Sequence, residues 1–157
     1  MDSQAFTLFH VVLSLLGIAS GLIVLYGLLK SQRMPALTWF FLLTTIATSA
    51  TGYFFERDKI LPSHIVGAIS LAVLALAVVA LYFGRLRGAW RATYVITAVI
   101  GLYLNMFVLV AQSFLKIPAL HELAPTGQEP PFAIGEGIVL LIFIVLGVLA
   151  VKRFRPH

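Results

Sequence analysis

The sequence predicts an all-α integral membrane protein, a five-transmembrane-helix bundle with its N-terminus outside and its C-terminus cytoplasmic. Three observations lead to this prediction. The first is composition, because 61% of the 157 residues are hydrophobic and only 11% are charged, whereas soluble domains carry roughly 25% charged residues. The second is a set of long apolar stretches. The third is the uneven distribution of lysine and arginine between the connecting segments.

The apolar stretches have the length of membrane-spanning helices. A helix rises about 1.5 Å per residue, so about 20 mostly apolar residues cross a hydrocarbon core about 30 Å thick. Five stretches qualify, none with a proline, lysine or arginine in its interior: residues 6–29, 36–55, 64–83, 93–115 and 132–151. We therefore expect residues 1–157 to form a single membrane domain. The first stretch lacks the basic flank of a secretory signal and is expected to remain as a helix.

The segments between these stretches contain residues that end or begin helices. Lys30 and Arg33 follow the first stretch, where cations favour a helix C-terminus, and Pro35 suits the start of the next helix. The outer loop 116–131 is long and contains four prolines, which allows at most a short surface helix at 119–124. Two interpretations of this loop stay open, a cover over a binding site and a plain tether.

Lysine and arginine are concentrated on one side of the predicted bundle. Eight of the 11 fall there, namely Lys30, Arg33, Arg85, Arg87, Arg91, Lys152, Arg153 and Arg155. Cytoplasmic loops are rich in these residues, so this side is assigned to the cytoplasm and the protein to the inner (plasma) membrane. All six acids fall on the other side. The basic isoelectric point thus reflects topology, and no nucleic-acid partner is expected because the basic loops are too short to build a binding surface.

The chain contains no cysteine, and this excludes several classes of membrane redox protein. Disulfide relays, iron–sulfur clusters and covalently attached c-type haem all require thiols, as does a cysteine nucleophile.

Few ionisable side chains lie within the predicted helices, and together with Gln112 they fall at one depth. His10, His64, Gln112 and Glu136 each lie near the outer end of a different helix, within roughly 6 Å of the outer boundary at about 1.5 Å per residue. Such groups are costly inside a membrane and usually converge on a cavity, a partner or a ligand. The alternative is that each reaches water or headgroups separately, because all four are close to a helix end.

Stripes of small or polar residues are predicted to face the bundle interior, because their spacing of three or four residues places them on one helix face. The stripe of the first helix comprises His10, Ser14, Gly17 and Gly21, and that of the last comprises Glu136, Leu140, Phe143 and Gly147. Small residues on such stripes allow close helix approach or leave room for a ligand.

The favoured interpretation of the polar layer is a cofactor or small-ligand site with a redox role. A b-type haem would take His10 and His64 as axial ligands, with Gln112 and Glu136 around them and the outer loop as cover. A divalent metal would instead be bound by His10, His64 and Glu136, since two histidines and a carboxylate are common ligands of zinc or iron. No helix-borne catalytic motif accompanies these residues, so catalytic residues and enzymatic activity stay undetermined.

Two other functions stay open. A non-catalytic subunit of a larger membrane complex, or a homo-oligomer, would associate through small-residue faces such as Gly17-x-x-x-Gly21. A transporter of small molecules or ions is less favoured, because the cytoplasmic half of the helices has few polar side chains and five helices give no even inverted repeat. In every case the lipid bilayer surrounds the chain.

Overall fold

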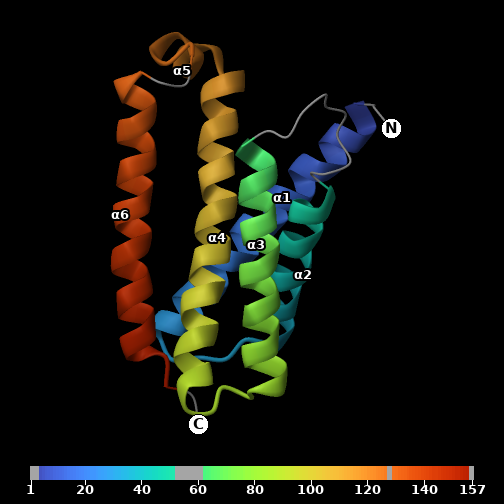
Figure 1. The fold of residues 1–157 in the computed structure, drawn as a ribbon, viewed down its shortest axis with the longest axis vertical. Helices are drawn as coiled ribbons and strands as arrows, with labels where there is room; N and C mark the ends of the chain where they lie inside the picture. Colours follow the sequence, from blue (N-terminus) through green and yellow to red (C-terminus); the bar gives the residue numbers. More distant parts are fainter. Residues whose placement is uncertain (1–3, 52–61, 127–128, 156–157) are drawn as a thin grey trace.

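The computed structural model describes residues 4–51, 62–126 and 129–155 of the chain, apart from the side chains of residues 62–64 and 115. All regular elements in these ranges are helices, which confirms the predicted all-α class there (Figure 1). In chain order they are α1 (Gln4–Leu29), α2 (Pro35–Thr51), α3 (Pro62–Val78), the π-helical turn η2 (Val79–Phe83), α4 (Ala89–Lys116), α5 (Pro118–Leu123) and α6 (Pro130–Arg153).

Four of the helices are long and apolar enough to cross a membrane, and they cover Gln4–Leu29, Ile65–Phe83, Ala89–Phe114 and Pro130–Arg153. Each agrees with a predicted stretch to within a helical turn. α2 has 17 described residues, and residues 52–55, which complete the second predicted stretch, lie outside the described residues. The short helix expected in the outer loop is present as α5.

Consecutive long helices run in opposite directions along the bundle (Figure 1). α1 crosses the bundle obliquely beside α2, α3 lies against α4, and α6 lies against α4 and α1. The α1–α2 turn, the η2–α4 turn and the last turn of α6 share one end, here called the basic end. The opposite end, which holds α5 and the first turns of α1 and α6, is called the acidic end.

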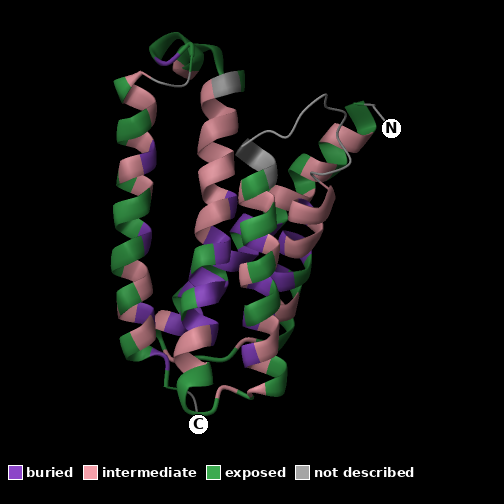
Figure 2. Ribbon diagram, in the orientation of Figure 1, coloured by how far each residue is buried: buried purple, intermediate pink, exposed green. Residues whose placement is uncertain are grey.

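The most closely packed part of the bundle lies toward the basic end (Figure 2). Phe41, Leu42, Leu74, Tyr94 and Leu102 are each at most 2% exposed there. Many large apolar side chains on the outward faces of α1, α3 and α6 stay exposed. In water so much apolar surface would favour aggregation, whereas in hydrocarbon it is compatible with a stable protein because the helices satisfy their own backbone hydrogen bonds.

Glycines in α1 allow α2 and α4 to approach it closely. A Cβ on Gly21 would lie 2.6 Å from Leu102 Cδ1 and 2.8 Å from Phe41 Cε1, and one on Gly17 would lie 2.9 Å from Thr45 Oγ1. These distances confirm that the predicted glycine stripe of the first helix faces the bundle interior.

Hydrogen bonds hold the last turn of α6 against the start of α4. Arg91 Nη1 donates to the backbone oxygens of Val151, at 2.7 Å, and Phe154, at 2.9 Å. The ring of Phe154 lies 6.1 Å from that of Tyr94 and is 2% exposed. Arg91 therefore satisfies carbonyl groups that a helix C-terminus leaves without intrahelical partners.

Candidate functional site

Glu136 is a buried acid within a helix that is long and apolar enough to cross a membrane. It lies in α6 and is 7% exposed. Neither carboxyl oxygen has a hydrogen-bond partner among the described residues. A buried carboxyl group without partners is costly whether it is charged or neutral, because both forms lose their hydrogen bonds to water. Glu136 is therefore the strongest candidate for a ligand-binding residue among those predicted.

Aromatic rings from α4 and α6 flank Glu136 along the interface between these helices. Toward the acidic end, the ring centroids of Phe114 and Phe132 are 5.4 Å apart in an edge-to-face arrangement. Toward the basic end, the rings of Tyr103 and Phe143 are 5.8 Å apart, and Tyr103 lies within electrostatic range of Glu136. The carboxyl group thus lies between two aromatic pairs.

An apolar groove of about 380 Å³ lies between α4 and α6, on the basic-end side of Glu136, which is not one of its lining residues. Tyr103, Phe143 and Leu140 line its first part, and Lys152 lies at its far end. Leu140 follows Glu136 by one helical turn and is 41% exposed, so its predicted inward orientation is wrong. The buried stripe of α6 instead repeats every seven residues, at Glu136, Phe143 and Ala150.

His10 in α1 is held by a hydrogen bond to α2. Its Nδ1 lies 2.9 Å from Thr51 Oγ1, and the Thr51 hydroxyl donates to Ala47 O at 2.7 Å. Because the Thr51 hydroxyl donates to Ala47 O, an Nδ1–H tautomer of His10 can donate to Thr51 Oγ1. Ligand histidines in metalloproteins are commonly oriented in this way through their second nitrogen.

The two remaining predicted residues, His64 and Gln112, lie in α3 and α4. His64 lies in the first turn of α3, but its side chain is outside the described residues, and Gln112 is half-buried in α4. Among the described residues, no three His, Asp or Glu side chains form a group that could hold a metal ion. The N-terminal parts of α1 and α6, which carry His10 and Glu136, lie on opposite sides of the bundle in Figure 1.

A second polar cluster joins α1, α2 and α4 deeper in the bundle. Ser14 Oγ donates to Asn105 Oδ1 at 3.0 Å, and Asn105 Nδ2 lies 3.4 Å from Ser14 O. Nearby, Thr45 is 1% exposed, and its hydroxyl has no hydrogen-bond partner among the described residues. The sequence placed Ser14 on the inward face of the first helix but could not pair it with Asn105, because a stripe on one helix does not encode the register between α1 and α4.

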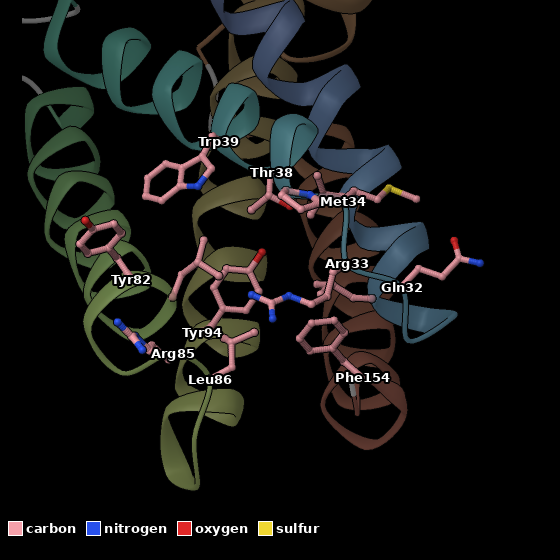
Figure 3. A pocket seen from close by; sticks show the side chains of 14 residues that line it. Gln32, Arg33, Met34, Thr38, Trp39, Tyr82, Arg85, Leu86, Tyr94 and Phe154 are labelled. Carbon is pink, nitrogen blue, oxygen red and sulfur yellow. The ribbon is translucent and has the colours of Figure 1, made fainter. Parts of the chain in front are cut away.

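A cavity of about 320 Å³ at the basic end was not predicted from the sequence (Figure 3). The α1–α2 turn, the start of α2, the η2–α4 turn, α4 and Phe154 all contribute to its lining. Arg33 and Arg85, which the sequence places between predicted helices on the cytoplasmic side, are among the lining residues. The signal available in the sequence was the presence of aromatic residues beside each arginine, with Trp39 after Arg33 and Tyr82 before Arg85.

Comparison of the chain with protein-family models, with curated proteins and with solved structures finds no match.

Proposed function

We propose that this protein is a multi-pass protein of the inner (plasma) membrane that binds a small ligand or cofactor through Glu136. The observation that carries the proposal is the burial of Glu136, 7% exposed, with neither carboxyl oxygen hydrogen-bonded among the described residues. An ionisable residue inside a membrane span marks a functional site more often than a structural one.

The surroundings of Glu136 favour an apolar ligand with a cationic or hydrogen-bond-donating head. Such a head would supply the missing partner of the carboxyl group, and the rings of Tyr103, Phe114, Phe132 and Phe143 would contact it through cation–π or edge interactions. The apolar groove between α4 and α6 would accept the rest of the molecule.

Binding of two probes tests this proposal in mild detergent. Tetraphenylphosphonium supplies an apolar cation, and a short-chain quinol supplies hydroxyl donors on an apolar ring. We expect one of the probes to bind, and Glu136→Gln to weaken its binding at least tenfold. Glu122→Gln is the matched control, because Glu122 is an exposed acid on α5. Absence of binding by both probes, or equal loss in the two variants, would contradict the proposed ligand class.

A b-type haem or a metal bound through His10 is the second candidate function. It is supported by the contact between His10 Nδ1 and Thr51 Oγ1 at 2.9 Å, which would orient the imidazole ring. His10 and His64 would be the residues that hold the haem. When bound, haem would supply one-electron chemistry, while the protein would orient His10 through Thr51.

The absorption spectrum and metal content of the purified protein test the second candidate. A Soret band that is lost in both His10→Ala and His64→Ala would support haem. Zinc or iron without haem that is lost in both histidine variants would support a metal bound through the histidines. A colourless, metal-free protein would contradict both and favour a non-catalytic subunit of a larger membrane complex or a homo-oligomer.

The proposal includes five membrane crossings, with the N-terminus outside. It is supported by four helices of sufficient length and composition, and by the position of α2 beside α1. Described lysine and arginine side chains also gather at the end assigned to the cytoplasm. A cytoplasm-dependent reporter fused after His157 should be active, and an inactive fusion would reverse the orientation.

A further inference from the structure

The cavity at the basic end combines segments that are distant in the sequence (Figure 3). Gln32, Arg33 and Met34 come from the α1–α2 turn, Arg85 and Leu86 from the η2–α4 turn, and Phe154 from the residues after α6. This end of the bundle lies far from Glu136, which occupies the first third of α6. Its function is therefore separate from the ligand proposed for Glu136.

Two arginines give the cavity a positive charge. The Arg33 side chain extends into it toward Tyr94, and Arg85 lies at the other side near Tyr82 (Figure 3). Among the described residues, the Asp and Glu side chains are Glu122, Glu129 and Glu136, all of which lie in the half of the bundle nearer the acidic end. Within the described part of the chain, no carboxylate side chain is therefore near enough to neutralise the two guanidinium groups.

Hydroxyl groups and a helix N-terminus add hydrogen-bond donors to the same cavity. Thr38 and Tyr94 line it and are 6% and 2% exposed, and their hydroxyls are neighbours. α2 begins at Pro35, which also lines the cavity. Pro35 has no N–H, and the N–H of Thr38 donates to Met34 O at 2.7 Å. The first-turn N–H groups without an intrahelical acceptor are therefore those of Ala36 and Leu37.

The remaining walls are apolar and aromatic. Val24, Leu28 and Leu81 line the inner part. Trp39 and Tyr82 meet edge to face with ring centroids 6.4 Å apart, and such residues are typical of the membrane–water interface. The cavity thus places positive charge at the interface and apolar surface toward the membrane interior.

We infer that this cavity is a binding site for a phosphate group, with Arg33 and Arg85 as its principal ligands. Guanidinium groups match the geometry of phosphate oxygens through paired N–H donors. Basic pockets between helices on the cytoplasmic side are suited to anionic headgroups. The phosphate can belong to an anionic phospholipid, whose acyl chains would follow the apolar walls, or can be free in solution.

Backbone conformation indicates that the arginine turn is held in place by its surroundings. Arg85 and Leu86, two consecutive residues that line the cavity, have φ values of 51° and 59°. Non-glycine residues rarely adopt this left-handed conformation, because their Cβ atom crowds the backbone there. The turn thus keeps Arg85 at the cavity in spite of an unfavourable local conformation.

Ligand-dependent thermal stability of the purified full-length protein tests this inference. In neutral detergent at constant ionic strength, the probes are dioctanoyl-phosphatidylglycerol, dioctanoyl-phosphatidylcholine, inorganic phosphate and chloride. A ligand that binds the folded state raises Tm with its concentration. We expect phosphatidylglycerol, inorganic phosphate or both to raise Tm by several degrees, with no comparable effect of phosphatidylcholine or chloride.

Arginine variants assign the effect to the cavity. Arg33→Gln and Arg85→Gln should each remove most of the Tm shift, whereas Arg87→Gln should keep it, because Arg87 lies in the same turn but does not line the cavity. Arg33→Lys keeps the charge and should retain only part of the shift. Folding of each variant is checked by circular dichroism and size-exclusion chromatography without ligand.

Each outcome bears on the inference. A shift with phosphatidylglycerol alone identifies a lipid headgroup, a shift with inorganic phosphate alone identifies a free anion, and a shift with both supports a phosphate site open to either source. Equal loss in Arg87→Gln and Arg33→Gln would show unspecific charge attraction and overturn the site. Absence of any shift would also overturn it. Glu136→Gln should leave the shift intact, which separates this result from the ligand proposed for Glu136.

Discussion

The hydroxyl of Ser14 in α1 donates a 3.0 Å hydrogen bond to Asn105 Oδ1 in α4. The two residues are 91 positions apart in the sequence, and Asn105 is 7% exposed. The bond therefore fixes the register of two helices that no short connection joins. In a membrane such bonds replace contacts that water cannot supply.

Loss of this bond should weaken the bundle measurably. We expect Ser14→Ala to lower the free energy of unfolding by about 0.6 kcal/mol, the average for interhelical hydrogen bonds in membranes. Asn105→Leu should cost more, and the double variant should be less destabilised than the sum of the single ones. Reversible unfolding in mixed detergent micelles measures the difference. Ser113→Ala is the control, because Ser113 Oγ donates to Leu109 O within its own helix and to no other helix among the described residues. Strict additivity at Ser14 and Asn105 would contradict the coupling.

Glycine at position 21 should be far more sensitive to substitution than glycine at position 137. A Cβ on Gly21 would approach Leu102 Cδ1 to 2.6 Å, whereas one on Gly137 meets nothing within 4 Å among the described residues. Gly21→Ala should therefore cost about 1–3 kcal/mol through overpacking, and Gly137→Ala should be neutral or stabilising because alanine favours helix. Thermal unfolding in one detergent measures the Tm of both variants. Equal Tm values would contradict the close packing of α1.

Replacement of Glu136 by an apolar residue of similar length should stabilise the protein. The carboxyl oxygens have no hydrogen-bond partner among the described residues, so Glu136→Met removes a desolvation cost of about 1–3 kcal/mol. The variant should have a higher Tm and should no longer bind the ligand proposed above. Glu122→Met, at an exposed position, should change neither property. A lower Tm for Glu136→Met would show that Glu136 makes a structural contribution instead.

Arg91 should control the stability of the end of α6. Its two hydrogen bonds to the backbone oxygens of Val151 and Phe154 involve a charged donor, and such bonds contribute about 1.5–3 kcal/mol each when a partner is removed. Arg91→Gln should speed amide hydrogen exchange in the last turn of α6 by at least tenfold. Arg87→Gln, which removes a charge in the adjacent turn, should leave that exchange unchanged; similar protection in both variants would contradict the role of Arg91.

Helix positions were predictable from the sequence because length and hydropathy determine them. Basic residues or proline occur at the end of α1, at the start of α2 and at both ends of α6, and the observed bounds agree with these positions. The inward face of α1 was also predictable, since Gly17 and Gly21 contrast with their large neighbours. In α6 almost every residue is apolar, so the sequence carries little information about which side faces the bundle, and Leu140 was placed on the wrong face.

A candidate site could be predicted from the sequence only where a single helix contains the residue that marks it. Glu136 stands out in the sequence because it is an acid in an apolar stretch, and its burial supports that choice. The cavity at the basic end depends on Arg33 and Arg85 lying in separate turns. Both arginines line one cavity because of how α2 and α3 pack, and no pattern within either turn encodes this arrangement. The pairing of His10 with Thr51 is likewise a consequence of how α1 and α2 are aligned.

Because Arg91 holds the last turn of α6, a tilt of this helix about its basic end would displace its N-terminal part the most. Glu136 lies 15 residues from Val151, a separation of about 22 Å along a helix. A tilt of about 5° around the basic end would move Glu136 by about 2 Å on that length, while the Arg91 hydrogen bonds would hardly change. A shift of that size would be large enough to decide whether the head of the ligand proposed for Glu136 reaches the carboxyl group.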